Sequence, residues 1–267
     1  MAKSKKKGRQ QGGSPAGTKQ AVRMPGVAPA TPGGPNRLAR KEEARRQREA
    51  LRRKMARRRG LRIGGAVVAF VVVVAAVTVY VLTRPSPAAA AGCGSVQVIP
   101  PYIPTANDRS HITAGGSVPT PPALSTYRSV PPASGPHDGT PQPAGVYPTP
   151  PGIYHVIHSL EHAAVVIWYP PGAKSAELTK LQTFYNDPIN QDHIIVSPFT
   201  YPDQGAAGKL PAGKQMVLVA WHHVEFCNQL SLSAAQDFVK HYRLTTGEAA
   251  SAAYDGDAPE PGLTIGP

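Results

Sequence analysis

Four side chains that can bind metal ions fall within eight consecutive residues, from His155 to His162. His158 and His162 are four positions apart, so on a helix their rings lie on one face and can share a metal ion. Glu161 sits one residue from that face. His155 precedes His158 by three positions, a spacing that fits a surface residue equally well. The stretch therefore predicts a site built on His158, Glu161 and His162.

These three residues form the pattern H-x-x-E-H, which is typical of inverted zinc metallopeptidases. In such enzymes the two histidines bind zinc and the glutamate, here Glu161, activates water. The motif lies on a long helix there, whereas in this chain a strand-like run starts directly after His162. We therefore expect a binding or structural role rather than catalysis, with a zinc-dependent hydrolase as an alternative.

A third imidazole can come from His137, at the end of the proline-rich segment 131–136. The prolines fix φ and Gly135 permits an unusual turn, so the loop can hold His137 against the other two rings. Three imidazoles, with or without a carboxylate, suit Zn²⁺ or Cu²⁺. In the other interpretation, these side chains only hydrogen-bond loops to the sheet, in a structural or protein-interaction module. The predicted metal ligands are His137, His158, His162 and Glu161.

The elements around this site alternate between strand and helix patterns. A β-branched and aromatic run ends at Pro170, and Ser175 is a plausible N-cap for a helix with apolar residues at helical spacing. The sequence thus predicts a small α+β domain of order β-α-β-β-α. Its predicted elements are strand 163–169, helix 175–185, strands 194–196 and 215–221, and a helix from Ser231 or Ser233 through Tyr242.

The positive charge of the chain belongs to its N-terminal part. Residues 1–62 contain 20 Lys and Arg and three Glu, a net charge of +17, whereas residues 83–267 carry −4. Residues 1–39 lack hydrophobic periodicity and are predicted to be disordered, and residues 40–59 to form a basic juxtamembrane helix. This tail lacks aromatic interleaving or a recognised nucleic-acid motif, so we expect it to meet anionic lipid headgroups rather than nucleic acid.

Residues 63–82 form an uncharged apolar run of 20 residues, about 30 Å as a helix. We predict a transmembrane helix, with the N-terminus in the cytoplasm because the flanking basic residues precede it. After it, we expect a linker at 83–91, an extracytoplasmic domain at 92–245 whose first 59 residues form a proline-rich wrap, and a polar tail at 246–267. The sequence predicts a single-pass cell-membrane protein and identifies no protein partner.

Both cysteines, Cys93 and Cys227, would then lie on the oxidising side of the membrane. An isolated pair there is typical of a disulfide rather than of a metal or redox site. Closing the 134-residue separation would stabilise the domain by at most about 5 kcal/mol in the chain-entropy model. It would also tie the proline-rich wrap to the C-terminal half of the domain.

Several ordered motifs also resemble a known family: PPASGPH at 131–137, HSLEH at 158–162 leading into VVIWYP at 165–170, and Ala220-Trp221 with a following Cys227. Over roughly residues 92–245 the chain resembles bacterial membrane-anchored proteins classed as a domain of unknown function. The resemblance implies an envelope-facing domain behind one transmembrane helix, without an established activity. The family has glycine where this chain has Ala163 and His222, and the second departure makes His222 and His223 poor candidates for a shared site.

Overall fold

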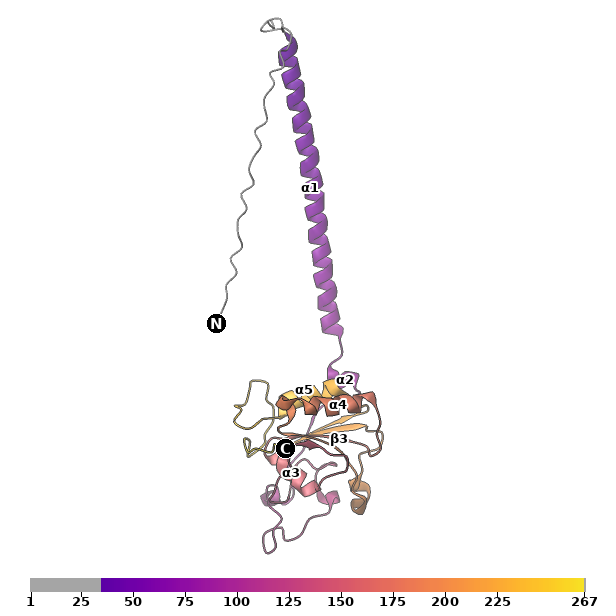
Figure 1. The fold of residues 1–267 in the computed structure, drawn as a ribbon, viewed down its shortest axis with the longest axis vertical. Helices are drawn as coiled ribbons and strands as arrows, with labels where there is room; N and C mark the ends of the chain where they lie inside the picture. The colour runs from indigo at the N-terminus through magenta and orange to yellow at the C-terminus, as the bar shows by residue number, and fades with distance from the viewer. Residues whose placement is uncertain (1–34, 267) are drawn as a thin grey trace, which may run out of the picture. The chain divides into compact units, whose positions relative to one another are not determined.

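A computed structural model of the protein describes residues 35–266 (Figure 1). The chain divides into two compact units, residues 1–79 and 80–267. The sequence predicts disorder over residues 1–39. Residues 1–34 of that segment lie outside the described residues, and the residues from Pro35 onward are helical.

The described residues of the N-terminal unit belong to one long helix, α1 (Pro35–Thr83). The sequence predicts two helical segments, at 40–59 and 63–82, but Gly60 and its neighbours do not interrupt the helix, because single glycines cost only about 1 kcal/mol each in a helix. By length and composition α1 can cross a membrane: an 18-residue window has a mean hydropathy of 2.7. The segment predicted as a linker, 83–91, contains a short helix, α2 (Pro87–Ala90), capped by Ser86.

The second unit is built on a mixed six-stranded sheet of order β1-β6-β5-β3-β4-β2. Strands β2, β3 and β4 are parallel, whereas β5, β6 and β1 continue the sheet in antiparallel pairs. The strands are β1 (Gln97–Val98), β2 (Gly145–Val146), β3 (Val165–Tyr169), β4 (Ile194–Pro198), β5 (Met216–Ala220) and β6 (His223–Cys227). The 3-10 turns are η1 (Thr105–Asn107), η2 (Leu124–Thr126), η3 (Pro188–Asn190) and η4 (Pro202–Gly208).

Helices cover both faces of the sheet. In Figure 1, α4 (Ala176–Asn186) and α5 (Leu232–Tyr242) lie on one face and α3 (Ile153–Glu161) on the other. The sheet has a hydrophobic core on each face, and alternate residues of β3 pack into one or the other. Ile167 packs into the core on the α4 and α5 side, and Trp168 into the core on the α3 side. As the sequence predicts, Ser175 caps α4 by accepting a hydrogen bond from the Leu178 amide at 3.1 Å.

The predicted order β-α-β-β-α is incomplete. It omits β6, because β5 and β6 are joined by a two-residue turn with no glycine, in which His222 has a φ of 58°. It also omits α3, since that helix has only nine residues and its N-cap, Gly152, provides no side-chain hydrogen bond. The omission of α3 matters for the site, because this helix carries its central residues, His158 and Glu161.

Two irregular segments of the domain, the proline-rich wrap and the C-terminal segment, pack against the same face of the sheet as α3. Buried residues of the proline-rich wrap, such as Leu124 and Tyr127, join the core under α3. The sequence predicts a polar tail after residue 245, but in the structure this segment returns to the domain. Ile265 is buried and accepts a hydrogen bond from the Ala144 amide at 2.6 Å.

Candidate metal site

Helix α3 carries one imidazole and one carboxylate of the site on the same face. His158 and Glu161 are three residues apart, so they project from neighbouring turns, and both are buried. The apolar residues of the same helix, such as Ile157 and Leu160, face the sheet and fix its orientation. The helix ends in a Schellman motif, in which the Ala164 amide donates to the Ser159 carbonyl.

His137 reaches this face from the proline-rich loop. Gly135 adopts a φ of +116°, and a Cβ atom there would lie 2.8 Å from the Tyr127 ring. Only glycine fits this position, because the left-handed backbone and the close ring both exclude a side chain. The loop thereby buries His137 completely, with its ring centroid 4.8 Å from that of His158.

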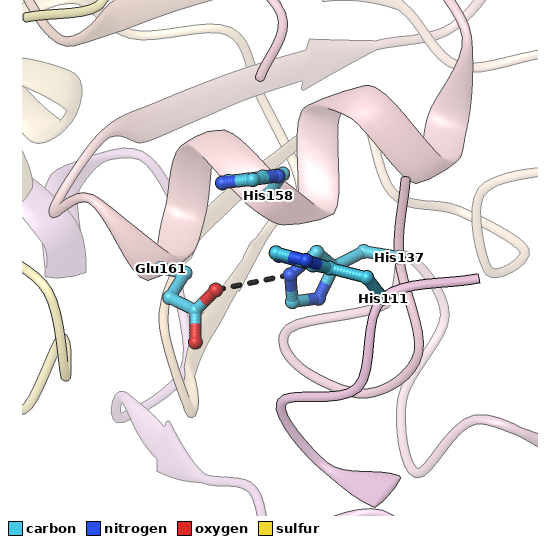
Figure 2. A group of neighbouring side chains, drawn as sticks. All are labelled: His111, His137, His158 and Glu161. Atoms are coloured by element: carbon cyan, nitrogen blue, oxygen red, sulfur yellow. Dashed lines mark ion pairs between the residues drawn. The ribbon is translucent and has the colours of Figure 1, made fainter. Parts of the chain in front are cut away.

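His111 is the member of the cluster that sequence patterns do not predict. Its segment pairs with the His137 segment, since the Ile112 amide donates to the His137 carbonyl at 2.7 Å. The exposed His111 ring stacks on His158 with centroids 5.0 Å apart. Figure 2 shows the three rings and Glu161 converging. One ligand atom from each of His111, His137, His158 and Glu161 lies within 4.8 Å of the others.

Backbone carbonyls fix the tautomers of the buried imidazoles. The Nδ1 atom of His137 lies 2.8 Å from the Gly135 oxygen, and that of His158 lies 2.6 Å from the Asp138 oxygen. A carbonyl oxygen only accepts, so each Nδ1 carries the proton and each Nε2 retains its lone pair when the ring is neutral. Metal-binding histidines are oriented by the same kind of hydrogen bond.

Glu161 is the charged centre of the cluster. Its Oε1 atom accepts a hydrogen bond from Arg109 Nε at 2.7 Å, and its Oε2 atom lies 3.0 Å from His137 Nε2 (Figure 2). Burial raises the pKa of Glu161, but the contacts with His137 and Arg109 outweigh this effect and lower the pKa to about 2. The carboxylate is therefore ionised throughout the physiological range.

The same environment keeps His158 neutral. Burial and the neighbouring imidazoles lower the pKa of His158 to about 4, against the opposing effect of its bond to the Asp138 carbonyl. An unprotonated Nε2 therefore faces the cluster at neutral pH, which is the form that binds a metal ion.

His162 lies next to the cluster rather than in the set of four. Its ring centroid is 4.7 Å from that of His158, but the residue follows the last helical position. Its Nδ1 atom donates to the Glu260 carbonyl at 2.9 Å, and its buried Nε2 has no hydrogen-bond partner in the described residues. Of the four predicted ligands, the structure thus brings together His137, His158 and Glu161, adds His111, and places His162 at the side.

The C-terminal segment closes over this side of the site. The Glu260 amide donates to the Glu161 carbonyl at 3.1 Å, and the Glu260 carboxylate forms an ion pair with Arg109. His155, in contrast, is not part of the cluster: its Nδ1 atom lies 2.7 Å from the Thr140 carbonyl oxygen and 3.3 Å from the Asp138 carboxylate.

The two cysteines form the predicted disulfide, Cys93–Cys227, which confirms that pairing. His222 lies outside the His/Glu cluster and forms ion pairs with Asp108 and Asp257. Within the part of the chain that the structure describes, the cluster of three histidines and a glutamate shares no residue with either feature.

The fold and the cluster define the class of protein: an α+β domain with a mixed six-stranded sheet, a largely buried His/Glu cluster and a long apolar N-terminal helix. Residues 123–256, half of the chain, match the family model described as protein of unknown function (DUF3105), and the chain belongs to this family. The matched range includes His137, His158 and Glu161, and it begins after His111. No curated protein and no solved structure matches the chain.

Proposed function

We propose that the domain binds one transition-metal ion through His111, His137, His158 and Glu161. The observation that carries this proposal is the contact between His137 and Glu161. Because the Nδ1 proton of His137 is used by the Gly135 carbonyl, a neutral ring turns its Nε2 lone pair toward a carboxylate oxygen 3.0 Å away. Two such atoms repel unless a cation, either a proton or a metal ion, lies between them.

The separation of these two atoms suits a shared metal ion. Ligands about 2.1 Å from one metal ion, at angles of about 90–110°, are about 3.0–3.4 Å apart. The four ligand atoms lie within 4.8 Å of one another, so the wider separations must close to about 3.0–3.4 Å when the ion binds. The exposed His111 side chain can make much of this movement, because neither of its ring nitrogens is hydrogen-bonded within residues 35–266.

Three imidazoles and one carboxylate suit zinc or copper. Hydrolysis with Glu161 as the base is less well supported, because one carboxylate oxygen accepts a hydrogen bond from Arg109 and the other faces His137 Nε2 at 3.0 Å, where the proposed ion would lie. A carboxylate with a pKa of about 2 is also a weak general base. A structural or protein-interaction module, in which a proton joins His137 to Glu161, is the alternative that experiment must exclude.

Metal loading of the full chain, purified without an affinity tag in detergent, tests the proposal. After incubation with Zn²⁺ or Cu²⁺ and desalting, elemental analysis should find one ion per wild-type chain and markedly less in His158→Ala. His155→Ala is the matched control, since it removes an imidazole from the same helix outside the cluster and should retain the ion. Wild-type protein that stays metal-free, or His158→Ala that binds as the wild type does, would leave the interaction module as the better account.

We also propose that α1 anchors the protein in the cell membrane, with the N-terminus in the cytoplasm and the domain outside. The excess of basic residues before the apolar run supports this orientation, and the disulfide suits an oxidising compartment. The basic tail would then lie against anionic lipid headgroups, each Lys or Arg adding about 1 kcal/mol. Protease added to spheroplasts should digest the domain and spare an N-terminal epitope; the reverse pattern would invert the topology.

A further inference from the structure

A buried carboxyl group lies beside the disulfide on the opposite face of the sheet. Glu225 and Cys227 are alternate residues of β6, so both point toward the core under α4 and α5. One carboxylate oxygen of Glu225 lies within 4.8 Å of both sulfur atoms. Glu225 is 5% exposed, and its side chain makes no hydrogen bond or ion pair in the described residues.

The surroundings of Glu225 favour its protonated form. Burial, aided by the negative charge of Asp237 on α5, raises the pKa of Glu225 to about 7. Tyr242 of α5 also interacts electrostatically with Glu225, and the Tyr242 ring packs against that of His223 on β6 with centroids 4.7 Å apart. The carboxyl group can therefore give or take a proton near neutral pH.

The two cysteine residues differ in exposure. Cys227 is fully buried, whereas Cys93 is half-buried at the edge formed with β6. An attacking thiolate from outside thus meets the Cys93 sulfur, and the Cys227 sulfur becomes the leaving group. A thiolate left in an apolar core is costly, so proton transfer to it would assist the step.

We propose that Cys93–Cys227 is an exchangeable disulfide that accepts electrons from a dithiol, with Glu225 as the acid that protonates Cys227. A thiolate of the dithiol attacks Cys93 Sγ, the bond between the cysteines breaks, and its electron pair stays on Cys227 Sγ. Glu225 gives its proton to that sulfur and later regains one from water. The second thiol of the dithiol loses its proton to water and attacks its partner sulfur, releasing Cys93, which is then protonated. The dithiol is oxidised to a disulfide, and both cysteines are reduced.

Reduction of the full chain in detergent micelles by dithiothreitol tests this proposal. The rate, read by acid quench, alkylation and mass spectrometry, is divided by the reagent's thiolate concentration from about pH 5.5 to about pH 8.5. The wild-type rate should fall as pH rises through Glu225 deprotonation. Glu225→Gln should react at least about tenfold more slowly near pH 6 and lose that inflection.

Two further variants keep the test decisive if Glu225→Gln fails to fold, which tryptophan fluorescence would reveal. Glu225→Asp retains a carboxyl group and should retain a pH inflection. Asp237→Asn removes a neighbouring negative charge and should move the inflection to lower pH. The proposal is wrong if Glu225→Gln keeps the wild-type rate and profile, if Asp237→Asn leaves the inflection in place, or if dithiothreitol does not reduce the folded wild-type protein.

Discussion

His222 is a charged residue held between two carboxylates at the turn joining β5 and β6. Its Nε2 atom lies 2.9 Å from Asp108, and its Nδ1 atom lies 3.3 Å from Asp257. Burial alone would lower the pKa of His222, but the bonds to Asp108 and Asp257 outweigh burial and raise this pKa to about 9. The imidazolium therefore joins the proline-rich wrap, the hairpin turn and the C-terminal segment at neutral pH.

This interaction predicts a loss of stability at alkaline pH. Because the folded pKa is raised from about 6.5 in the unfolded chain, the stabilisation is complete below about pH 6.5 and disappears as pH rises through about 9. The free energy of unfolding should fall by about 3 kcal/mol over that window. Urea unfolding across pH would measure it. His222→Gln should lose most of the slope, and an unchanged slope would rule out the ion pairs as its cause.

Residue spacing predicts part of the site and misses the rest for a physical reason. His158 and Glu161 are recognisable because a helix places residues three apart on one face. His137 is predictable from the stiffness of its loop. His111 gives no such signal, since a pairing between two irregular segments brings it to His137. His162 has the helical spacing, but α3 ends one residue too early.

At the scale of elements, the junction between α3 and β3 fixes where the site lies. Ala163 adopts a φ of 67° in the Schellman motif, a left-handed position that favours glycine. A left-handed Ala costs about 1–2 kcal/mol, which the burial of its methyl group partly offsets. The junction thus tolerates Ala and disfavours larger residues.

Two substitutions test this explanation of the junction. Ala163→Gly should change the free energy of unfolding by less than about 1 kcal/mol, because relief of backbone strain and loss of a buried methyl group oppose each other. Ala163→Val should lower it by at least about 2 kcal/mol, since a β-branched residue is strongly disfavoured at positive φ. Chemical denaturation would compare them, and an equally stable Val variant would contradict the assignment.

The C-terminal segment is the second element that positions the site. Its main chain bonds both Glu161 and His162 through Glu260. Removing residues 257–267 should weaken Zn²⁺ or Cu²⁺ binding by about 10–100-fold, the usual effect of losing groups that orient ligands. Chelator competition would measure the affinity. Glu260→Ala separates the two contributions, because it keeps both main-chain bonds and removes the half-exposed carboxylate that pairs with Arg109; equal affinity of the truncated chain would exclude this role.

At the scale of the whole molecule, composition and periodicity predict how the chain divides into an N-terminal helix and a domain. The topology of the sheet is harder to predict from the sequence. The charge asymmetry and the uncharged run indicate one long apolar helix before an α+β domain. The sheet order depends on pairings between distant segments, including the two short strands β1 and β2, which have no periodic signal. The packing of the C-terminal segment against the domain is also not predictable from the sequence, because many of its contacts are main-chain hydrogen bonds.

The disulfide should dominate the stability of this domain. It links residues 134 apart, and the chain-entropy model assigns such a link about 5 kcal/mol as an upper value. Replacing both cysteines by alanine should therefore lower the free energy of unfolding by several kcal/mol, on the order of 3–5. Denaturant titration of the oxidised wild type beside the double variant would measure the difference. A difference below about 1 kcal/mol would mean that the unfolded chain is already restricted.

X-ray absorption spectroscopy of the Zn²⁺- or Cu²⁺-loaded full chain tests the central claim most directly, because it reports the atoms bound to the metal. We predict a first shell of nitrogen and oxygen at about 2.0–2.2 Å, with the outer scattering of about three imidazoles. His158→Ala should lose one imidazole, and His155→Ala should lose none. A spectrum dominated by sulfur, or one without imidazole scattering, would contradict a site made by His111, His137, His158 and Glu161.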